Sequence, residues 1–111
     1  MIAFRYKATI VRWVDGDTVD CEVDLGFYTV SRQRFRLDGI NTPERGQPGY
    51  ADAILLASEQ CPVGSKVEIE STKTEKFGRW LAVVWTRDGE SINAKLISAG
   101  LAKHYSGGPR V

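Results

Sequence analysis

Residues 18–24 read TVDCEVD, and this stretch decides the class of fold. Apolar and polar side chains alternate along it with a period of two, which is typical of a β-strand with one buried and one solvent-facing side. The dipeptide Asp15-Gly16 just before it is a common hairpin turn, and residues 8–14 (ATIVRWV) before the turn are rich in β-branched side chains. The sequence therefore predicts an antiparallel hairpin near the start of the chain.

The chain beyond this hairpin predicts a third strand over residues 27–40. The apolar positions within it change parity between Val30 and Phe35. Because side chains of a regular strand alternate strictly between two faces, such a change indicates an irregularity. We expect a β-bulge or a strong bend near residues 31–33.

Two helices and two further strands complete the chain. The helices are predicted over residues 50–61 and 91–100, the second beginning at the N-cap Ser91 and ending at Gly100, and the strands over residues 66–71 and 79–86. The order is then β-β-β-α-β-β-α. A mainly β chain with five short strands and two helices in this order is typical of a five-stranded Greek-key barrel of OB type.

Length and composition limit the classes of protein. A chain of 111 residues has room for one domain. Lys plus Arg number 15 and Asp plus Glu 14, so the formal net charge is only +1. A polyanionic partner would therefore need a local basic patch on the surface. The longest apolar run, residues 80–85 (WLAVVW), has six residues, against about 20 for a membrane span. The start MIAFRYK lacks the apolar stretch of a secretory signal. We expect a cytoplasmic monomer with no membrane partner.

Cysteine and histidine chemistry has little support. The two cysteines, Cys21 and Cys61, are too few and too far apart in sequence for a zinc site. Their alternatives are one disulfide or two separate thiols, and the strand position of Cys21 favours a buried thiol. The single histidine, His104, disfavours catalytic sites of the Ser-His-Asp and Cys-His types.

Four short polar stretches concentrate residues that a protein core does not need. They are residues 15–18 (DGDT), the strand positions Arg32, Arg34, Arg36 and Asp38, residues 41–44 (NTPE), and residues 73–79 (KTEKFGR). Each has an ordinary interpretation alone: a hairpin turn, a solvated strand face, the entry to a turn, and the start of a strand. Together they contain the residue types that a phosphodiesterase requires.

The chemistry assigns a role to five of these residues. Asp17 and Asn41 offer oxygen ligands to a hard cation such as Ca²⁺. Glu44 offers a carboxylate that can act as general base on a water molecule. Arg36 and Arg79 offer planar guanidinium groups that can clamp phosphoryl oxygens.

Five motifs, in order along most of the chain, resemble the thermonuclease family. They are VDGDT (residues 14–18), FRL (residues 35–37), NTPE (residues 41–44), FGRWLA (residues 77–82) and NAKLISAGLAK (residues 93–103). The resemblance implies one nuclease domain over residues 1–111, an OB barrel that cleaves DNA and RNA with Ca²⁺ and leaves 3′-phosphate ends.

The resemblance also places residues in roles. It puts Asp17, Asn41 and the backbone carbonyl of Thr42 at calcium-ligand positions, Arg36 and Arg79 at the catalytic arginines, and Glu44 at the catalytic carboxylate. The family often has Asp at the position of Asn41, and Asn removes one negative charge, which should weaken Ca²⁺ binding. The family's tyrosine before the second arginine is Phe77 here.

Three further residues are candidates for contact with nucleic acid. Tyr105 can stack on a base or simply pack against the fold. Lys73 and Lys76 can follow a phosphate backbone or belong to a solvated loop. The leading interpretation of the chain is a metal-dependent nuclease acting on DNA or RNA. The alternative is a catalytically silent OB module that binds nucleic acid or a protein.

Overall fold

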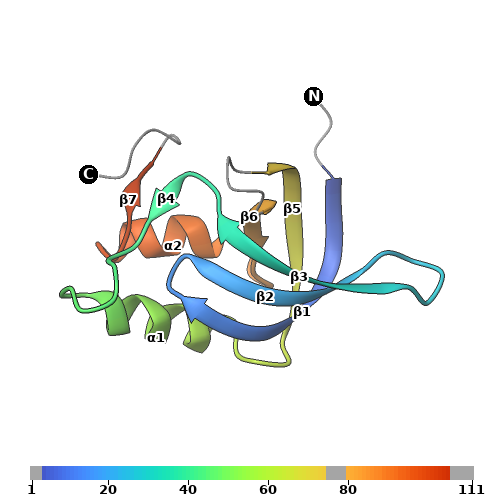
Figure 1. Cartoon of the computed structure of the whole chain (residues 1–111), viewed down its shortest axis with the longest axis horizontal. Coiled ribbons are helices and arrows are strands. Elements are labelled where there is room, and N and C mark those ends of the chain that lie inside the picture. Colours follow the sequence, from blue (N-terminus) through green and yellow to red (C-terminus); the bar gives the residue numbers. More distant parts are fainter. Residues whose placement is uncertain (1–3, 75–79, 106–111) are drawn as a thin grey trace.

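The structure, a computed structural model, describes residues 4–74 and 80–105. Its elements follow the chain in the order β1 (Phe4–Asp15), β2 (Thr18–Asp24), β3 (Val30–Leu37), β4 (Ile40–Asn41), α1 (Tyr50–Gln60), β5 (Lys66–Thr74), β6 (Trp80–Trp85), α2 (Ile92–Ser98) and β7 (Lys103–His104) (Figure 1). Within the described residues, no helix has the length and apolar content to cross a membrane.

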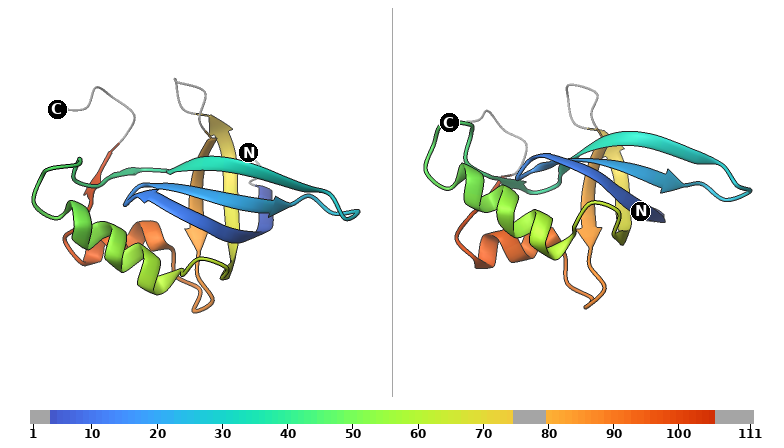
Figure 2. Two further views of the ribbon diagram at one scale, coloured as in Figure 1. Left: turned by 60° about the horizontal axis from the view of Figure 1, so that its bottom comes forward. Right: turned by 90° about the horizontal axis from the view of Figure 1, so that it is seen from below.

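Five strands close into a barrel in the order β1-β2-β3-β6-β5, with β5 returning to pair with β1. The β3–β6 pair is parallel and the other neighbouring strands are antiparallel. Helices α1 and α2 lie side by side next to the barrel (Figure 2). This arrangement confirms the predicted five-stranded barrel with two helices. The two-residue strands β4 and β7, which pair with each other outside the barrel, were not predicted.

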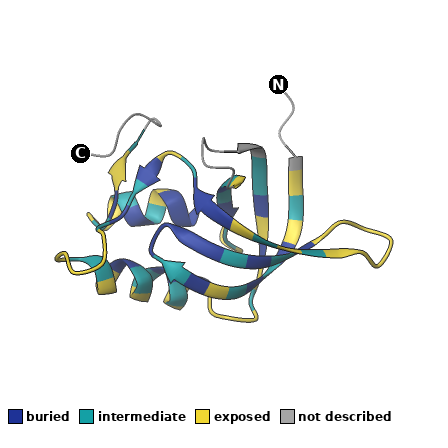
Figure 3. Cartoon of the chain, viewed as in Figure 1, coloured by how far each residue is buried: buried dark blue, intermediate teal, exposed yellow. Residues whose placement is uncertain are grey.

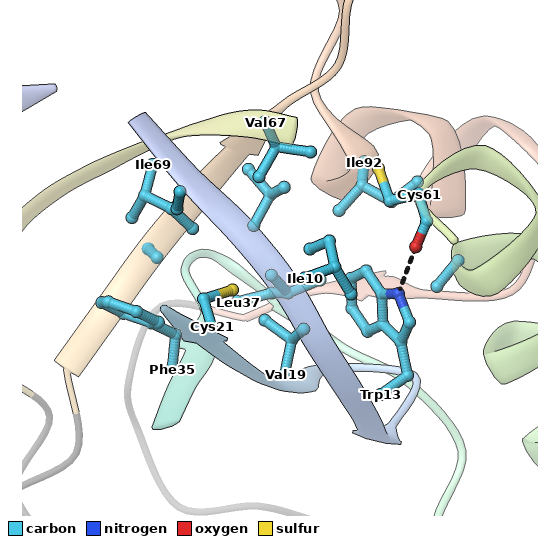
Figure 4. Packing of buried hydrophobic residues seen from close by; sticks show 14 of the residues in the cluster. Ile10, Trp13, Val19, Cys21, Phe35, Leu37, Cys61, Val67, Ile69 and Ile92 are labelled. Atoms are coloured by element: carbon cyan, nitrogen blue, oxygen red, sulfur yellow. Dashed lines mark hydrogen bonds between the residues drawn. The ribbon is translucent and has the colours of Figure 1, made fainter. Parts of the chain in front are cut away.

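The core lies inside the barrel and beneath the two helices (Figure 4). Trp13 is buried there, and its indole Nε1 donates a hydrogen bond to the Cys61 carbonyl at 2.9 Å, which ties β1 to the end of α1. Cys21 and Cys61 are both buried and free, so the prediction of separate thiols is confirmed. Burial raises the pKa of Cys21 to about 12 and that of Cys61 to about 11. Both thiols are therefore neutral packing groups.

Helix α2 has the predicted signals at both ends. The Ser91 hydroxyl accepts a hydrogen bond from the Ala94 amide at 3.0 Å, as an N-cap does. Gly100 has a φ of +75°, and the Leu101 amide donates to the Leu96 carbonyl at 2.9 Å. This is the bonding of a Schellman cap, in which the left-handed residue is usually glycine. These local signals fix where α2 begins and ends.

The third strand differs from its prediction. It covers only Val30–Leu37, and its ladder with β2 is regular from Asp24↔Val30 to Thr18↔Arg36, so the bulge expected near residues 31–33 is absent. The register shifts lie instead in the pairings of β1 and of β5. The parity of apolar residues changes for another reason: Val30 lies on a part of the hairpin that extends beyond the barrel, where neither face is buried (Figure 3).

Candidate functional site

Arg36 lies at the end of β3 and is buried, with only 6% of its surface exposed. Its Nη1 donates hydrogen bonds to the carbonyls of Leu37 at 3.1 Å and Ile40 at 2.9 Å. The ring of Tyr105 covers it with a centroid 5.3 Å from the guanidinium carbon, and the Tyr105 amide donates to the Gly39 carbonyl. The chain from β3 to β4 and the residue after β7 therefore hold the guanidinium in one place.

The other two arginines of this strand face behave differently. Arg34 makes an ion pair with Asp20 across the β2–β3 ladder, with a shortest N–O distance of 2.7 Å, and Arg32 pairs with Glu22 at 3.0 Å. The hydrogen bond from Arg34 lowers the pKa of Asp20. Both arginines are exposed. The solvated-face interpretation is correct for these two, whereas Arg36 is set apart by its burial.

Asp17 and Asn41 meet at Arg36, although they are far apart in sequence. Asp17 is buried, and its Oδ2 accepts a hydrogen bond from the Thr42 amide at 3.2 Å and lies 3.8 Å from Arg36 Nη2. The same Nη2 donates to Oδ1 of Asn41. The other carboxylate oxygen of Asp17 accepts from the Thr18 hydroxyl at 3.2 Å. The DGDT and NTPE stretches thus form one buried polar cluster with the arginine of the third strand.

Helix α1 sets the position of the turn that carries Asp17. A Cβ atom on Gly16 would lie 2.6 Å from the Cβ of Ala53 and 3.1 Å from the Thr42 hydroxyl, so only glycine permits this approach. The Tyr50 hydroxyl donates to the Asp15 carboxylate at 2.7 Å. The sequence did not indicate this contact, because Tyr50 fitted the apolar spacing of the helix. The turn therefore contacts α1 at two consecutive residues, Asp15 and Gly16.

Glu44 is exposed, two residues beyond the buried Thr42. Its amide donates to the Gln47 side chain at 3.2 Å, and the Gln47 amide donates to the Glu44 carbonyl at 3.0 Å, which forms a turn. Arg79, Lys76 and Phe77 lie outside the described residues. Lys73 lies in β5, where its backbone pairs with that of Leu81. The structure therefore brings together Asp17, Arg36, Asn41, Thr42 and Tyr105, and it puts Glu44 on the adjoining loop.

The donors of this cluster fit a hard cation in kind. A carboxylate, an amide oxygen and a backbone carbonyl are the groups that Ca²⁺ prefers. The hydroxyl of Thr42 is a further oxygen here; it is buried and has no hydrogen-bond partner among the described residues. The described residues contain no group of three or more His, Cys, Asp or Glu side chains placed to hold a metal. Of the three proposed donors, Asp17 alone is a carboxylate, and its Oδ2 lies 3.8 Å from Arg36 Nη2.

Comparison with known proteins identifies the family. The family described as "Staphylococcal nuclease homologue" matches residues 34–110. The chain belongs to this family.

Relatives that are named as nucleases support this family membership. The chain is 33% identical over 101 residues to a protein named Thermonuclease from Staphylococcus intermedius, an alignment that covers 85% of this chain and 56% of the relative. It is 28% identical over 110 residues to one named Micrococcal nuclease from Shigella flexneri, covering 90% of this chain and 59% of the relative. A protein named ParB from Escherichia coli is 27% identical over 107 residues, with 89% and 57% covered. The chain thus spans a little over half the length of these relatives.

Proposed function

We propose that this chain is a metal-dependent nuclease that hydrolyses phosphodiester bonds of DNA or RNA. The observation that carries the proposal is the buried cluster in which Asp17 and Asn41, from separate motifs, both contact Arg36. The fold does not need a charged side chain at this position. Burying the guanidinium of Arg36 is costly unless hydrogen bonds compensate. Membership of a family whose relatives include named nucleases supports the same conclusion.

Arg36 is the proposed clamp on the phosphate. Its Nη2 donates to Asn41 in the structure, so a phosphoryl oxygen that binds at Nη2 would replace Asn41 or share this donor with it. The hydrogen bonds from Nη1 to the two backbone carbonyls keep the guanidinium plane fixed during this exchange. A preorganised donor of this kind stabilises the charge that grows on the phosphoryl oxygens in the transition state. Arg79 is proposed as the second clamp, from its FGR motif.

Glu44 is the proposed general base. It is on an exposed loop next to the cluster, where a carboxylate can reach a water molecule beside a bound phosphate. Asp17, Asn41 and the carbonyl of Thr42 would hold the divalent cation, for which Ca²⁺ is our proposal. When bound, that cation would polarise a phosphoryl oxygen and neutralise its charge.

The test is cleavage of labelled single-stranded DNA, duplex DNA and RNA in the presence of Ca²⁺, Mg²⁺ or a chelator. Glu44→Gln should lower the cleavage rate by about 10²–10⁴-fold, with unchanged thermal stability and unchanged binding of a nucleotide. Arg36→Lys should lower the rate as well, and Arg34→Lys is its matched control, because Arg34 lies on the same face of β3 as Arg36 and forms an ion pair with Asp20. If the protein binds nucleotide tightly but cleaves no substrate under any of these conditions, the nuclease proposal is wrong and the silent OB module is the better interpretation.

A further inference from the structure

The tip of the β2–β3 hairpin projects from the barrel (Figures 1 and 2). It precedes the first residue of β3, Val30, whereas Arg36 lies near the other end of that strand. Phe27 and Tyr28, at the turn, have relative exposures of 100% and 106%. Leu25 and Val30 beside them are also exposed, and the whole tip is yellow in Figure 3. Four large apolar side chains in six residues, none of them buried by the fold, form an apolar tip that the barrel does not use.

The backbone of the tip is strained in a way that the fold does not require. Phe27 and Tyr28 have φ values of 54° and 60°, and the Thr29 amide donates to the Gly26 carbonyl at 2.9 Å. This is a type I′ turn, whose two central positions favour Asn-Gly because both have positive φ. Aromatic residues rarely adopt this conformation, and full exposure provides no packing that offsets the strain. Strained residues of this kind concentrate at functional positions.

A cleft of about 1170 Å³ separates this tip from the barrel wall. Lys7, Lys66 and Arg87 line the wall, and Trp85 lies among them. Two acidic residues of the cleft already have basic partners: Glu22 pairs with Arg32, and Glu68 pairs with Arg5.

The charge that remains in the cleft is mainly positive. Lys7, Lys66 and Arg87 form no ion pair within the described part of the chain, and Asp24 is the one cleft carboxylate in that part that lacks one. The Asp24 carboxylate accepts a hydrogen bond from the Gly26 amide at 2.8 Å. The cleft therefore combines exposed aromatic rings on one side with a basic wall on the other.

We propose that this tip and cleft bind single-stranded nucleic acid, with bases stacked on Phe27 and Tyr28 and phosphates held by Lys7, Lys66 and Arg87. Stacking platforms beside a basic groove are how proteins bind single strands without reading their sequence. The inference rests on the proposed nuclease function, which supplies the substrate class.

The position of the surface supports this occupant. Strand β3 joins the tip directly to Arg36, and Val30 and Arg36 are roughly 20 Å apart at about 3.3 Å per residue. An OB fold covers about 4–16 nucleotides, and a single-stranded nucleic acid of that length can span this distance. A membrane-surface segment would carry Lys or Arg next to its apolar residues, and residues 25–30 contain neither.

The test compares the protein with a double variant, Phe27→Asn and Tyr28→Gly. Binding of fluorescein-labelled dT12 is followed by anisotropy with chelator present, so that no cleavage occurs. The variant should bind at least tenfold more weakly, and its melting temperature should be unchanged or higher because the turn strain is relieved. The control is Leu55→Ser, which removes another exposed apolar side chain, this one from helix α1, and should leave the affinity unchanged.

Two further measurements separate the possible outcomes. Replacing both Lys7 and Arg87 with Ala should reduce the slope of log affinity against log salt by about one for each phosphate that the variant no longer neutralises. Cleavage of a thymidine dinucleotide, too short to reach the tip, reports on the proposed nuclease alone. Equal dT12 affinity in the tip variant overturns this inference even if the dinucleotide is cleaved. A weaker dT12 affinity supports it even if no cleavage is seen.

Other occupants have their own readouts. Binding to vesicles of phosphatidylcholine and phosphatidylglycerol, or concentration-dependent self-association in sedimentation, is measured for both proteins. If either is abolished in the tip variant while dT12 affinity is unchanged, the tip serves a membrane or a second copy of the chain, and the nucleic-acid inference is wrong.

Discussion

Replacing Gly16 with Ala should destabilise the protein through one identifiable contact. The added Cβ would lie 2.6 Å from the Cβ of Ala53, whereas ordinary contact begins at 3.4 Å, so the two backbones must separate by about 0.8 Å. The Ala53 Cβ is attached directly to the backbone of α1 and has no side-chain torsion that could move it away. The turn that carries Asp17 must therefore shift relative to the helix.

The expected size of the effect follows from overpacking. Inserting a methyl group into a tightly packed site costs about 1–3 kcal/mol. For a domain of this size, that corresponds to a fall in melting temperature of roughly 5–20 °C. The hydrogen bond from the Thr42 amide to Asp17, at 3.2 Å, should also lengthen, because Gly16 lies beside both residues.

The assay is a double-mutant cycle measured by thermal and urea unfolding. Ala53→Gly removes the opposing methyl group and alone costs about 1 kcal/mol in helix propensity, in addition to the packing that the methyl group provides. If the contact is the cause, Gly16→Ala should cost clearly less in the Ala53→Gly background. Ala51→Gly is the control, because Ala51 is exposed on the same helix, and its effect should simply add. Additive losses for Gly16 and Ala53, or an unchanged melting temperature for Gly16→Ala, would refute the reasoning.

Four other outcomes are expected. Arg36→Lys should lower turnover on DNA by about 10²–10³-fold, whereas Arg34→Lys should change it less than twofold, as steady-state kinetics will show. Asn41→Asp should tighten Ca²⁺ binding without nucleotide in calorimetry, because it adds a carboxylate beside the Asp17–Arg36 pair. Burial raises the pKa of Cys21 to about 12, whereas the unfolded thiol ionises near 8.5. The free energy of unfolding should therefore fall as the pH rises from about 9 to about 12, and urea unfolding of Cys21→Ala should show a smaller fall. Trp13→Phe should cost about 1–3 kcal/mol in urea unfolding, because it removes the buried donor to the Cys61 carbonyl.

Local patterns in the sequence were sufficient for most of the fold. The alternation of residues 18–24 describes a strand because side chains of any β-strand point to opposite faces in turn. Ser91 and Gly100 bound the second helix because cap chemistry acts over three or four residues of backbone. The order of these elements then limits the chain to few topologies, and the observed barrel is among them. The order of the five motifs along the chain also indicated the family.

The strand pattern could not separate the three arginines of β3, and only the FRL motif singled out Arg36. Arg32, Arg34 and Arg36 share a residue type, a strand and a face. Arg36 alone is buried, because the β3–β4 connection bonds its guanidinium and Tyr105 covers it. The contact with Ile40 comes from β4 and that with Tyr105 from the chain after β7, so no periodicity within β3 encodes them.

The same limit applies to the turn at Gly16 and to the hairpin tip. A DG turn has the same local chemistry wherever it occurs, and the approach of Ala53 to Gly16 exists only once α1 has packed against β1. The parity change near Val30 was interpreted as a bulge because a strand was assumed to have one buried face along its whole length. Only the closed barrel shows where that face ends: beyond it the hairpin continues with no core to cover, so the alternation loses its physical cause.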